Sequence, residues 1–452
     1  MVKRLKVAYF SPLNPQRSGI SDYSEELLPR LAARADVDLY VDGFTPSSRE
    51  LVERFRVFDY KADPRLLGRL ADYDATVYHV GNDQRYHAAI YETALAHPGV
   101  VVLHDFALQT FFLELAHQRG DVNLYLDEVE ACHGALARAE TAETLRRGGT
   151  PAFFYEPESR PLNCRLTASA EGVIVHSEWS RARLSQIAPA TPVALVSHHV
   201  TPDALAVARD DEADENGARG GRRGAVEIAS FGFVSTRKGV ERTLRALAAL
   251  KGDYEFRYTL VGGAGDLDVV GQVRALGLAD RFSATGYVTL EEFKRRVASA
   301  DIVVNLRERT VGETSGSACR ALAAGCAVVV SNLGWFAELP DDCVVKIEED
   351  DAAETSLRDA LARLISDADL RRGLGGRARA YVAAAHSIEK SADEYVAFVR
   401  EVVARRERRR FVRRVSEALA ECGVGEADEN LLRAVSAEVA RVAPASLFKD
   451  EV

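Results

Sequence analysis

Two adjacent cations, Arg237 and Lys238, stand at the predicted start of a helix, directly after the apolar run 226–233. The helix dipole favours anions at that end, so two cations there are unfavourable by themselves. A bound diphosphate would remove the conflict, because it can pair with both side chains and with the free N–H groups of the first helical turn. Two solvated cations are the alternative, but the strand–loop–helix setting favours an anion site.

The stretch "VNLRERTVGETSGSACRALAAGCAVVVS", residues 304–331, predicts a second site of this kind. Its small and hydroxyl residues, "TSGSA", begin an alanine-rich helix and can surround phosphate oxygens. Arg307, at the end of the preceding apolar run, can face the same anion, and Glu313 can hold sugar hydroxyls. N-capping by Thr314 or Ser315 is the simpler alternative, but it explains one hydroxyl residue and not the whole run.

A loop near the start of the chain has a weaker signal for ligand binding. Gly19 lies shortly before an amphipathic helix, and without a Cβ it lets a ligand approach the backbone. The free N–H groups of that helix start favour an anion. The segment is neither a GxGxxG run nor a Walker loop. An ordinary loop with Ser18 or Ser21 as N-cap is the alternative.

Four polar residues stand at the ends of two apolar runs in the first half, namely His79, Asn82, His104 and Asp105. A His–Asp pair suggests acid–base chemistry, although no serine or cysteine nucleophile motif accompanies it. A purely structural role for each histidine is the alternative. The ten histidines are scattered without ligand spacing, and the "DLD" triplet at 266–268 is interpreted as solvated, so we predict no metal site.

Short apolar runs that alternate with helical patterns must position these residues. Runs this apolar suit strands buried on both faces, and hence parallel sheets with helices on each side. In the first half they are 6–10, 37–41, 75–80, 99–105, 172–177 and 192–197. In the second half they are 226–233, 255–263, 281–288, 301–306, 326–331 and 343–347. We therefore predict two doubly wound α/β domains that face each other across a cleft and bind ligands at the carboxyl ends of their strands.

The boundaries follow from changes in composition. We assign 1–207 to the first Rossmann-like domain, with a helical insertion at 106–148. Residues 208–225 are acidic, then rich in Gly and Arg, and are predicted to form a flexible linker or loop. The second Rossmann-like domain is assigned to 226–385. Helices are predicted for 386–452, with the first part crossing back to the first domain.

Composition excludes several classes of protein. The 452 residues are 47% hydrophobic and 28% charged, as in ordinary globular proteins. The net charge of −10 argues against nucleic-acid binding, and no apolar run reaches the roughly 18 residues of a membrane span. The first apolar run is too short for a signal peptide. The six cysteines lie far apart without a CxxC pair, so we expect reduced thiols in a cytoplasmic protein and no disulfide.

Six segments, taken in order, carry a resemblance to a known family. They read "SGISDYSEELLPRLA", "HPGVVVLHD", "VIVHSEWSRARL", "FGFVSTRKGVERTLRAL", "ATGYVTLEEFKRRVASADIVVNLR" and "GETSGSACRALAAGCAVVVSNLGWFAELP". Over roughly residues 5–400 the chain resembles the retaining family 4 (group 1) glycosyltransferases of GT-B architecture. The glutamate loop is similar to that of a variant branch with "GETSGS".

The resemblance implies a nucleotide sugar on the second domain and the acceptor mainly on the first. It implies catalytic roles for His104, Lys238 and Glu313, with His104 near the transferred sugar. The expected contacts to the donor diphosphate are Gly19, Arg237, Lys238, Arg307, Ser315, Gly316 and Ser317. The expected contacts to nucleobase and ribose are Tyr287, Val288 and Arg320. The residues expected on the acceptor side are His79, Asn82 and Asp105.

The sequence departs from the family's paired-glutamate motif. Arg320 stands at the position of the second glutamate, and Glu313 is one residue out of register with the first. Phe233 occupies the place of an arginine that often follows the glycine of the phosphate loop, and Arg307 or Arg237 can replace its charge. These departures concern the ribose contacts and therefore the identity of the donor.

The implied chemistry is transfer of a sugar from a nucleotide-diphosphate sugar to an acceptor hydroxyl with retention at the anomeric carbon. The acceptor would be a sugar or a lipid-linked acceptor, in glycan, glycolipid or polysaccharide biosynthesis, with no metal or other cofactor. Two alternatives stay open, namely a catalytically inactive GT-B protein that binds or scaffolds a partner, and a GT-B nucleotide-sugar epimerase. A phosphorylase would need a pyridoxal phosphate lysine motif, which we do not find.

Seven of the ten residues in 405–414, "RRERRRFVRR", are arginine in a chain that is acidic overall. A solvated helix whose arginines pair with acidic neighbours is the simpler interpretation. The alternative is peripheral contact with an anionic membrane, at its inner face, or with an acidic partner surface, since each basic residue near an anionic membrane adds about 1 kcal/mol.

Overall fold

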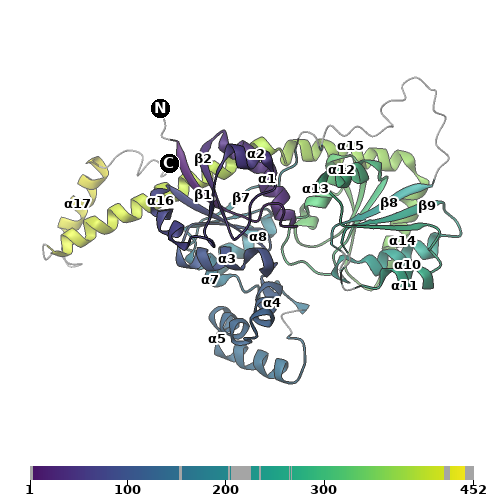
Figure 1. The fold of residues 1–452 in the computed structure, drawn as a ribbon, viewed down its shortest axis with the longest axis horizontal. Coiled ribbons are helices and arrows are strands. Elements are labelled where there is room, and N and C mark those ends of the chain that lie inside the picture. Colours follow the sequence, from purple (N-terminus) through teal and green to yellow (C-terminus); the bar gives the residue numbers. More distant parts are fainter. Residues whose placement is uncertain are drawn as a thin grey trace.

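Two parallel sheets with flanking helices make up the protein, as the apolar runs predict (Figure 1). The computed structural model describes residues 4–151, 155–201, 204, 225–233, 236–263, 265, 267–421 and 428–442. The predicted linker 208–225 lies almost wholly outside these residues.

The first sheet has seven strands in the order β3-β2-β1-β4-β5-β6-β7, all paired in parallel. Its strands are β1 (Leu5–Phe10), β2 (Ala35–Val41), β3 (Arg56–Asp59), β4 (Ala75–Val80), β5 (Val100–Leu103), β6 (Gly172–Val175) and β7 (Val193–Leu195). Its helices are α1 (Gly19–Ala32), α2 (Arg49–Arg54), η1 (Pro64–Asp72), α3 (Gln84–Ala96), α4 (Gln109–Arg119), α5 (Asn123–Arg146), α7 (Cys164–Ser169) and α8 (Glu178–Ile187). Strands β4, β5 and β6 are buried along their whole length, because helices cover both faces.

The second sheet has six strands in the order β10-β9-β8-β11-β12-β13, again all parallel. Its strands are β8 (Val226–Phe231), β9 (Phe256–Val261), β10 (Phe282–Gly286), β11 (Ile302–Asn305), β12 (Ala327–Ser331) and β13 (Val344–Ile347). Its helices are η3 (Thr236–Lys238), α10 (Val240–Leu250), α11 (Val269–Ala275), α12 (Leu290–Ser299), α13 (Gly316–Ala323), η4 (Gly334–Glu338), α14 (Ala353–Ser366) and α15 (Ala368–Ala385). The chain order reverses between β1 and β4 in the first sheet and between β8 and β11 in the second, which marks the places where open parallel sheets bind ligands.

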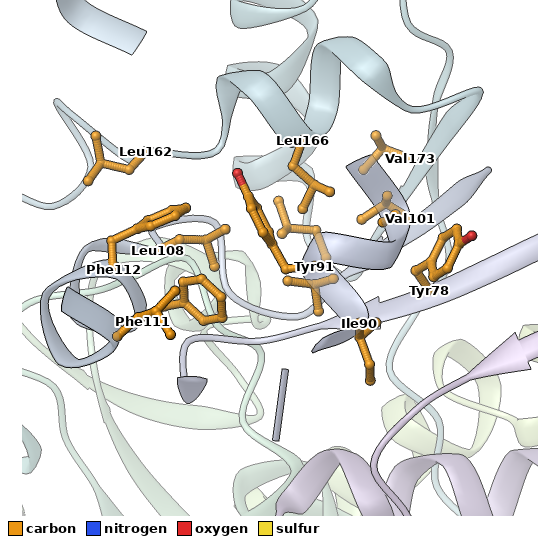
Figure 2. Packing of buried hydrophobic residues seen from close by; sticks show 14 of the residues in the cluster. Tyr78, Ile90, Tyr91, Val101, Leu108, Phe111, Phe112, Leu162, Leu166 and Val173 are labelled. Atoms are coloured by element: carbon orange, nitrogen blue, oxygen red, sulfur yellow. The ribbon is translucent and has the colours of Figure 1, made fainter. Parts of the chain in front are cut away.

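Each face of the first sheet has its own core. On one face, Tyr91 of α3, Phe111 of α4 and Leu166 of α7 pack against Val101 and Val173 of the strands (Figure 2). The other face is covered by α1 and by the C-terminal helix α16 (Ile388–Glu421), which returns to the first domain from the second. The chain is therefore discontinuous in the first domain, whose core needs residues from both ends of the sequence.

Close approach of α16 to the sheet is visible at β6. A Cβ added to Gly172 would lie 2.6 Å from Cγ2 of Val402 and 2.9 Å from Cζ of Phe398. Beyond the sheet, α16 continues away from the domain toward α17 (Glu429–Val442), as Figure 1 shows. In the basic stretch, Arg405 pairs with Glu401 of the same helix and Arg406 pairs with Glu171. These two arginines are thus engaged within the protein.

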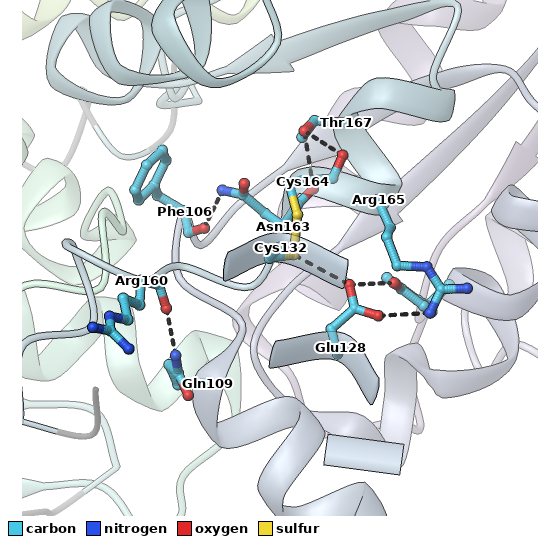
Figure 3. Close-up of a disulfide and its surroundings, with 10 residues drawn as sticks. Phe106, Gln109, Glu128, Cys132, Arg160, Asn163, Cys164, Arg165 and Thr167 are labelled. Atoms are coloured by element: carbon cyan, nitrogen blue, oxygen red, sulfur yellow. Dashed lines mark hydrogen bonds and ion pairs between the residues drawn. A yellow bond between two sulfur atoms is a disulfide. The ribbon is translucent and has the colours of Figure 1, made fainter. Parts of the chain in front are cut away.

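A disulfide joins the helical insertion to α7, which corrects the prediction of reduced thiols. Cys132 of α5 and Cys164 at the start of α7 are bonded, with their Cα atoms 5.6 Å apart (Figure 3). Next to it, the Glu128 carboxylate pairs with Arg165 at 3.0 Å. The two cysteines are 32 residues apart in sequence, and only the packing of α5 against α7 brings them together. Cys319, Cys326 and Cys343 are free and buried, and Cys422 lies outside the described residues.

No helix in the part of the chain that the structure describes is long and apolar enough to cross a membrane.

We predict that Phe398→Ala lowers the free energy of unfolding by about 3 to 5 kcal/mol, because it removes a buried ring from the contact between α16 and the first sheet. Arg400→Ala, at an exposed position of the same helix, is the matched control and should stay within about 0.5 kcal/mol of the parent protein. Urea denaturation of the two variants measures the difference. Equal stabilities would mean that α16 is not part of this core.

Candidate active site

A small cavity lies between the carboxyl ends of β8 and β11, where the strand order of the second sheet reverses. Its lining residues are Ser230, Phe231, Gly232, Phe233, Lys238, Val240, Leu260, Val304, Asn305, Leu306 and Arg307. Gly232 has a φ of +104°, and a Cβ there would lie 2.8 Å from Nζ of Lys238. Glycine at this position thus allows both the turn and the approach of the lysine.

The ammonium group of Lys238 is held in a positive, partly desolvated environment. Its pKa is lowered to about 7, mainly by removal from water and also by the guanidinium groups of Arg307 and Arg237, while Glu313 acts in the opposite direction. Arg237 and Lys238, the two adjacent cations predicted to face an anion, therefore lie near a third cation, Arg307, before the start of α10. Such a cluster favours binding of a multiply charged anion.

Arg307 is fixed by hydrogen bonds on several sides. Its Nε donates to Oε1 of Glu313 at 2.6 Å, and its Nη1 donates to Oδ1 of Asn305 at 3.0 Å and to the Leu306 carbonyl at 2.7 Å. Its backbone N–H donates to Oγ of Ser331 at 2.9 Å. These bonds fix the orientation of the guanidinium, which lines the cavity.

Both carboxylate oxygens of Glu313 accept hydrogen bonds from within the protein. Oε1 accepts from Arg307, and Oε2 accepts from the Thr310 hydroxyl at 3.1 Å and the Val311 amide at 3.0 Å. Burial raises the pKa of Glu313, but Arg307 and the two amides of the loop outweigh it, and the net shift is downward. Glu313 therefore stays ionised, and its hydrogen bonds orient Arg307 and the loop.

The start of α13 combines a capped end with free donors. The Ser315 hydroxyl accepts from the Ala318 amide at 3.2 Å, so this residue is the N-cap, as one interpretation of the sequence had it. The Ser317 hydroxyl accepts from the side-chain amide of Asn305 at 2.9 Å. Within the described residues the backbone amides of Gly316 and Ser317 have no protein acceptor, so they can bind an anion.

On the first domain, Gly19 is the first residue of α1, and Ser18 caps the helix through the Ile20 amide at 3.2 Å. A Cβ on Gly19 would meet no atom within 4 Å, so the backbone is accessible there. Arg17, just before the cap, stacks on the ring of Tyr287 in the second domain, with its Cζ 4.7 Å from the ring centroid. The structure thus brings the loop before α1 next to the expected nucleobase loop, while Val288 packs against the core of the second domain.

The polar strand ends of the first domain form two linked pairs. His79 Nδ1 lies 2.9 Å from His104 Nε2. The Asp105 carboxylate accepts a hydrogen bond from the backbone N–H of Asn82 at 2.7 Å. The side-chain oxygen of Asn82 in turn accepts from the backbone N–H of Phe111 at 2.8 Å, near the start of α4. Of these four residues His79 is fully buried, whereas Asn82, His104 and Asp105 are partly exposed.

Asp105 lies close to charged residues of the second domain. Burial and the nearby Glu313 carboxylate raise its pKa to about 6, whereas the Asn82 amide and Arg237 lower it. Asp105, Glu313, Arg237 and Lys238 thus share one electrostatic environment, although they come from opposite domains.

The loop that follows β11 is inserted between elements of the first domain. The Ala107 amide donates to the Val311 carbonyl at 2.8 Å, and the Ser180 hydroxyl donates to the Gly312 carbonyl at 3.2 Å. Gly312 has a φ of +77°, and a Cβ there would lie 2.3 Å from Cβ of Phe106. A larger residue at this position would separate the domains.

A second contact places a carboxylate of one domain on a helix of the other. Glu338 accepts from the amides of Glu178 and Trp179 at 3.0 and 2.6 Å, at the N-terminus of α8. The helix dipole favours a negative charge at this end.

Arg320 lies at the interface between the two domains. Its Nη2 is 2.9 Å from Oε2 of Glu26 on α1, and both side chains are nearly buried, at 13% and 12% exposure. Glu26 also lies 3.6 Å from the ring of His199. Burial raises the pKa of Glu26, but Arg320 and His199 outweigh it and the net shift is downward, so the carboxylate is ionised.

Sequence reasoning missed several residues of this region, namely Glu26, His176, His198, His199 and Tyr395. His198 and His199 directly follow an apolar run, so the strand-end rule that selected His104 could have selected them. Glu26 and Tyr395 lie inside helices and have no local signal.

Together, two doubly wound parallel domains with a cation-rich cavity at the switch point of the second define the GT-B architecture. Residues 226–367, in the second domain, match the family "Glycosyl transferases group 1". No curated protein matches the sequence.

Solved structures share the fold across nearly the whole chain. Sucrose-phosphate synthase from Thermosynechococcus elongatus has a TM-score of 0.62 at 17% identity, with 89% of this chain and 100% of that chain covered. HepE from Anabaena, in complex with UDP and glucose, has a TM-score of 0.56 at 16% sequence identity, with 88% of this chain and 99% of that chain covered. WaaG, a glycosyltransferase involved in lipopolysaccharide biosynthesis, has a TM-score of 0.55 at 17% sequence identity, with 86% of this chain and 98% of that chain covered. At these identities the likeness concerns the fold alone.

We predict that the Arg320–Glu26 pair shows strong coupling in a double-mutant cycle. Arg320→Met leaves an ionised carboxylate without its partner in a nearly buried interface, and such a loss costs about 3 to 5 kcal/mol. Adding Glu26→Gln removes that charge, so the double variant should be more stable than Arg320→Met alone. Thermal unfolding of the four proteins gives the coupling energy, and additive effects would contradict a direct ion pair.

Proposed function

We propose that the protein is a glycosyltransferase that takes its sugar from a nucleotide-diphosphate sugar bound to the second domain. The observation that carries the proposal is the cavity between β8 and β11, bordered by Lys238 and Arg307 and close to the free amides of α13. A diphosphate matches this arrangement, because its charge needs several cations and its oxygens need convergent N–H donors. The family match of residues 226–367 supports the same assignment.

The structural neighbours support a uridine nucleotide as the first donor to test, since HepE was solved with UDP and glucose. In this chain Tyr287 is 55% exposed and stacked under Arg17, which suits a nucleobase at the mouth of the cleft. The acceptor would enter from the first domain, past Asp105, and would be a sugar or a lipid-linked acceptor.

The proposed reaction forms a bond between the acceptor oxygen and the anomeric carbon while the bond from that carbon to the diphosphate breaks. Negative charge grows on the leaving phosphate, where Lys238 and Arg307 stabilise it. The acceptor proton passes to a phosphate oxygen on the same face, so the configuration is retained. Glu313 contributes by holding Arg307 through its Oε1. We propose that these cations act without a divalent metal.

Two other functions share this fold, namely a nucleotide-binding scaffold without activity and a nucleotide-sugar epimerase. The scaffold would bind a nucleotide sugar without turning it over. The epimerase would change the donor sugar without an acceptor.

The decisive experiment incubates the protein with UDP-sugars and a set of simple acceptors and follows the anomeric signals by proton NMR. We expect a glycoside with the anomeric configuration of the donor. A product of inverted configuration would contradict the mechanism, and an altered free donor sugar would support the epimerase.

We predict that Lys238→Ala lowers catalytic efficiency by on the order of 100-fold or more, because one preorganised charge at a leaving group is worth roughly 3 kcal/mol. Arg245→Ala, which removes an exposed cation of the same domain, is the matched control. Steady-state kinetics with the donor give the comparison, and melting temperatures show whether both variants fold. Full activity of the lysine variant would remove Lys238 from the site.

The pKa of Lys238 also predicts how nucleotide affinity changes with pH. The ammonium form, which pairs with the diphosphate, is present below about pH 7 and is lost as the pH rises through that value. Binding at higher pH must take up a proton, so the affinity for UDP should fall by up to about tenfold per pH unit above 7. Titration calorimetry between pH 7 and pH 9 measures the slope, and Lys238→Met should abolish it.

A further inference from the structure

A hydrogen-bond chain leads from the C-terminal helix α16 through the core of the first domain to His104. The Tyr395 hydroxyl, on α16, lies 3.0 Å from Nε2 of His79 on β4. The other ring nitrogen of His79, Nδ1, lies 2.9 Å from Nε2 of His104, directly after β5. Tyr395 is 316 residues away from His79 in sequence, and it reaches this ring because α16 returns to the first domain.

Only the last of the three residues reaches the surface. Tyr395 and His79 are buried, at 2% and 0% exposure, whereas His104 is partly exposed. The Tyr9 ring packs on His79 at 4.6 Å between centroids and helps to fix its plane. The inner two members thus have no access to solvent, and only His104 can meet a ligand.

All three groups are neutral. Burial lowers the pKa of His79 and of His104 well below the ordinary value, and the neighbouring His176 ring adds to both shifts. Burial raises the pKa of Tyr395 well above its ordinary value. Each imidazole therefore carries one proton, which sits either on Nδ1 or on Nε2.

The tyrosine decides the direction of the chain. Among the residues that the structure describes, the Tyr395 hydroxyl has no hydrogen-bond partner other than His79. If His79 donated to it, the hydroxyl proton would be buried without an acceptor, which is unfavourable. Tyr395 therefore donates to Nε2 of His79, and Nδ1–H of His79 donates to Nε2 of His104. The proton of His104 must then be on Nδ1.

We propose that Tyr395 is a positioning residue, which acts through His79 to fix His104 as the Nδ1–H tautomer and so presents a hydrogen-bond donor to the bound sugar. The part that concerns the sugar rests on the proposed glycosyltransferase function. His104 would thus orient a sugar oxygen rather than act as a general base, and the C-terminal helix would be part of the active-site support.

The first test uses two tyrosine variants that touch the same ring. Tyr395→Phe removes the donor, so neither tautomer of His79 keeps two partners and the preference of His104 is lost. Tyr9→Phe is the matched control, because its equally buried hydroxyl bonds to Ser24 at 2.9 Å and not to the chain. We expect Tyr395→Phe to lower kcat about tenfold with a smaller change in KM for the donor, and Tyr9→Phe to retain kcat.

The second test needs no substrate. In protein with 15N-labelled histidine, we expect the wild-type His104 signal, assigned by its loss in His104→Gln, to show a protonated Nδ1 and an unprotonated Nε2. Tyr395→Phe should shift this signal toward a mixture of tautomers, and Tyr9→Phe should leave it unchanged. A wild-type His104 protonated on Nε2, or a Tyr395→Phe protein with the wild-type tautomer and kcat, would overturn the proposal. Should no nucleotide sugar be turned over while the tautomers are as expected, the hydrogen-bond chain would stand and the proposed function would fail.

Discussion

The ion pair between Arg307 and Glu313 is the interaction on which the arrangement of the site depends. Both side chains are largely buried, at 10% and 17% exposure, so removing either partner would leave an uncompensated charge in a poorly hydrated place. The pair joins the end of β11 to the loop before α13. It therefore sets the direction of the guanidinium at the cavity and the path of the loop that reaches the first domain.

The same loop couples the chemistry of the second domain to the position of the first. Gly312 packs against Phe106 so closely that only glycine fits, and Glu338 and Arg320 make two further polar contacts across the interface. These contacts bring Asp105 of the first domain near Arg237 and Glu313 of the second. The structure thus represents the domains in contact, and any opening that admits a donor must break charged and hydrogen-bonded contacts and not only apolar ones.

Much of the fold follows from local pattern, because parallel strands buried on both faces form continuous apolar runs. The strand-end rule also selected Lys238 and Arg307, which line the cavity between β8 and β11, and His104, which is partly exposed at the end of β5. What local pattern cannot supply is the partner of each residue. Glu26 and Arg320 are 294 residues apart, and a carboxylate on a helix face reads as solvated until the opposite domain is in place. The disulfide was missed for the same reason, since its spacing has no signature outside the packed helices.

Return of the C-terminal helix has a consequence for how the protein is made. The apolar face of α1 and β1 is completed by residues of α16, yet the ribosome synthesises the whole second domain between them. The growing chain must therefore carry an incomplete first domain, with one face of its sheet uncovered, until residue 402 has left the exit tunnel. The second domain is continuous in sequence and can close first. Vectorial synthesis thus reverses the order of the domains, so that the one begun first is finished last.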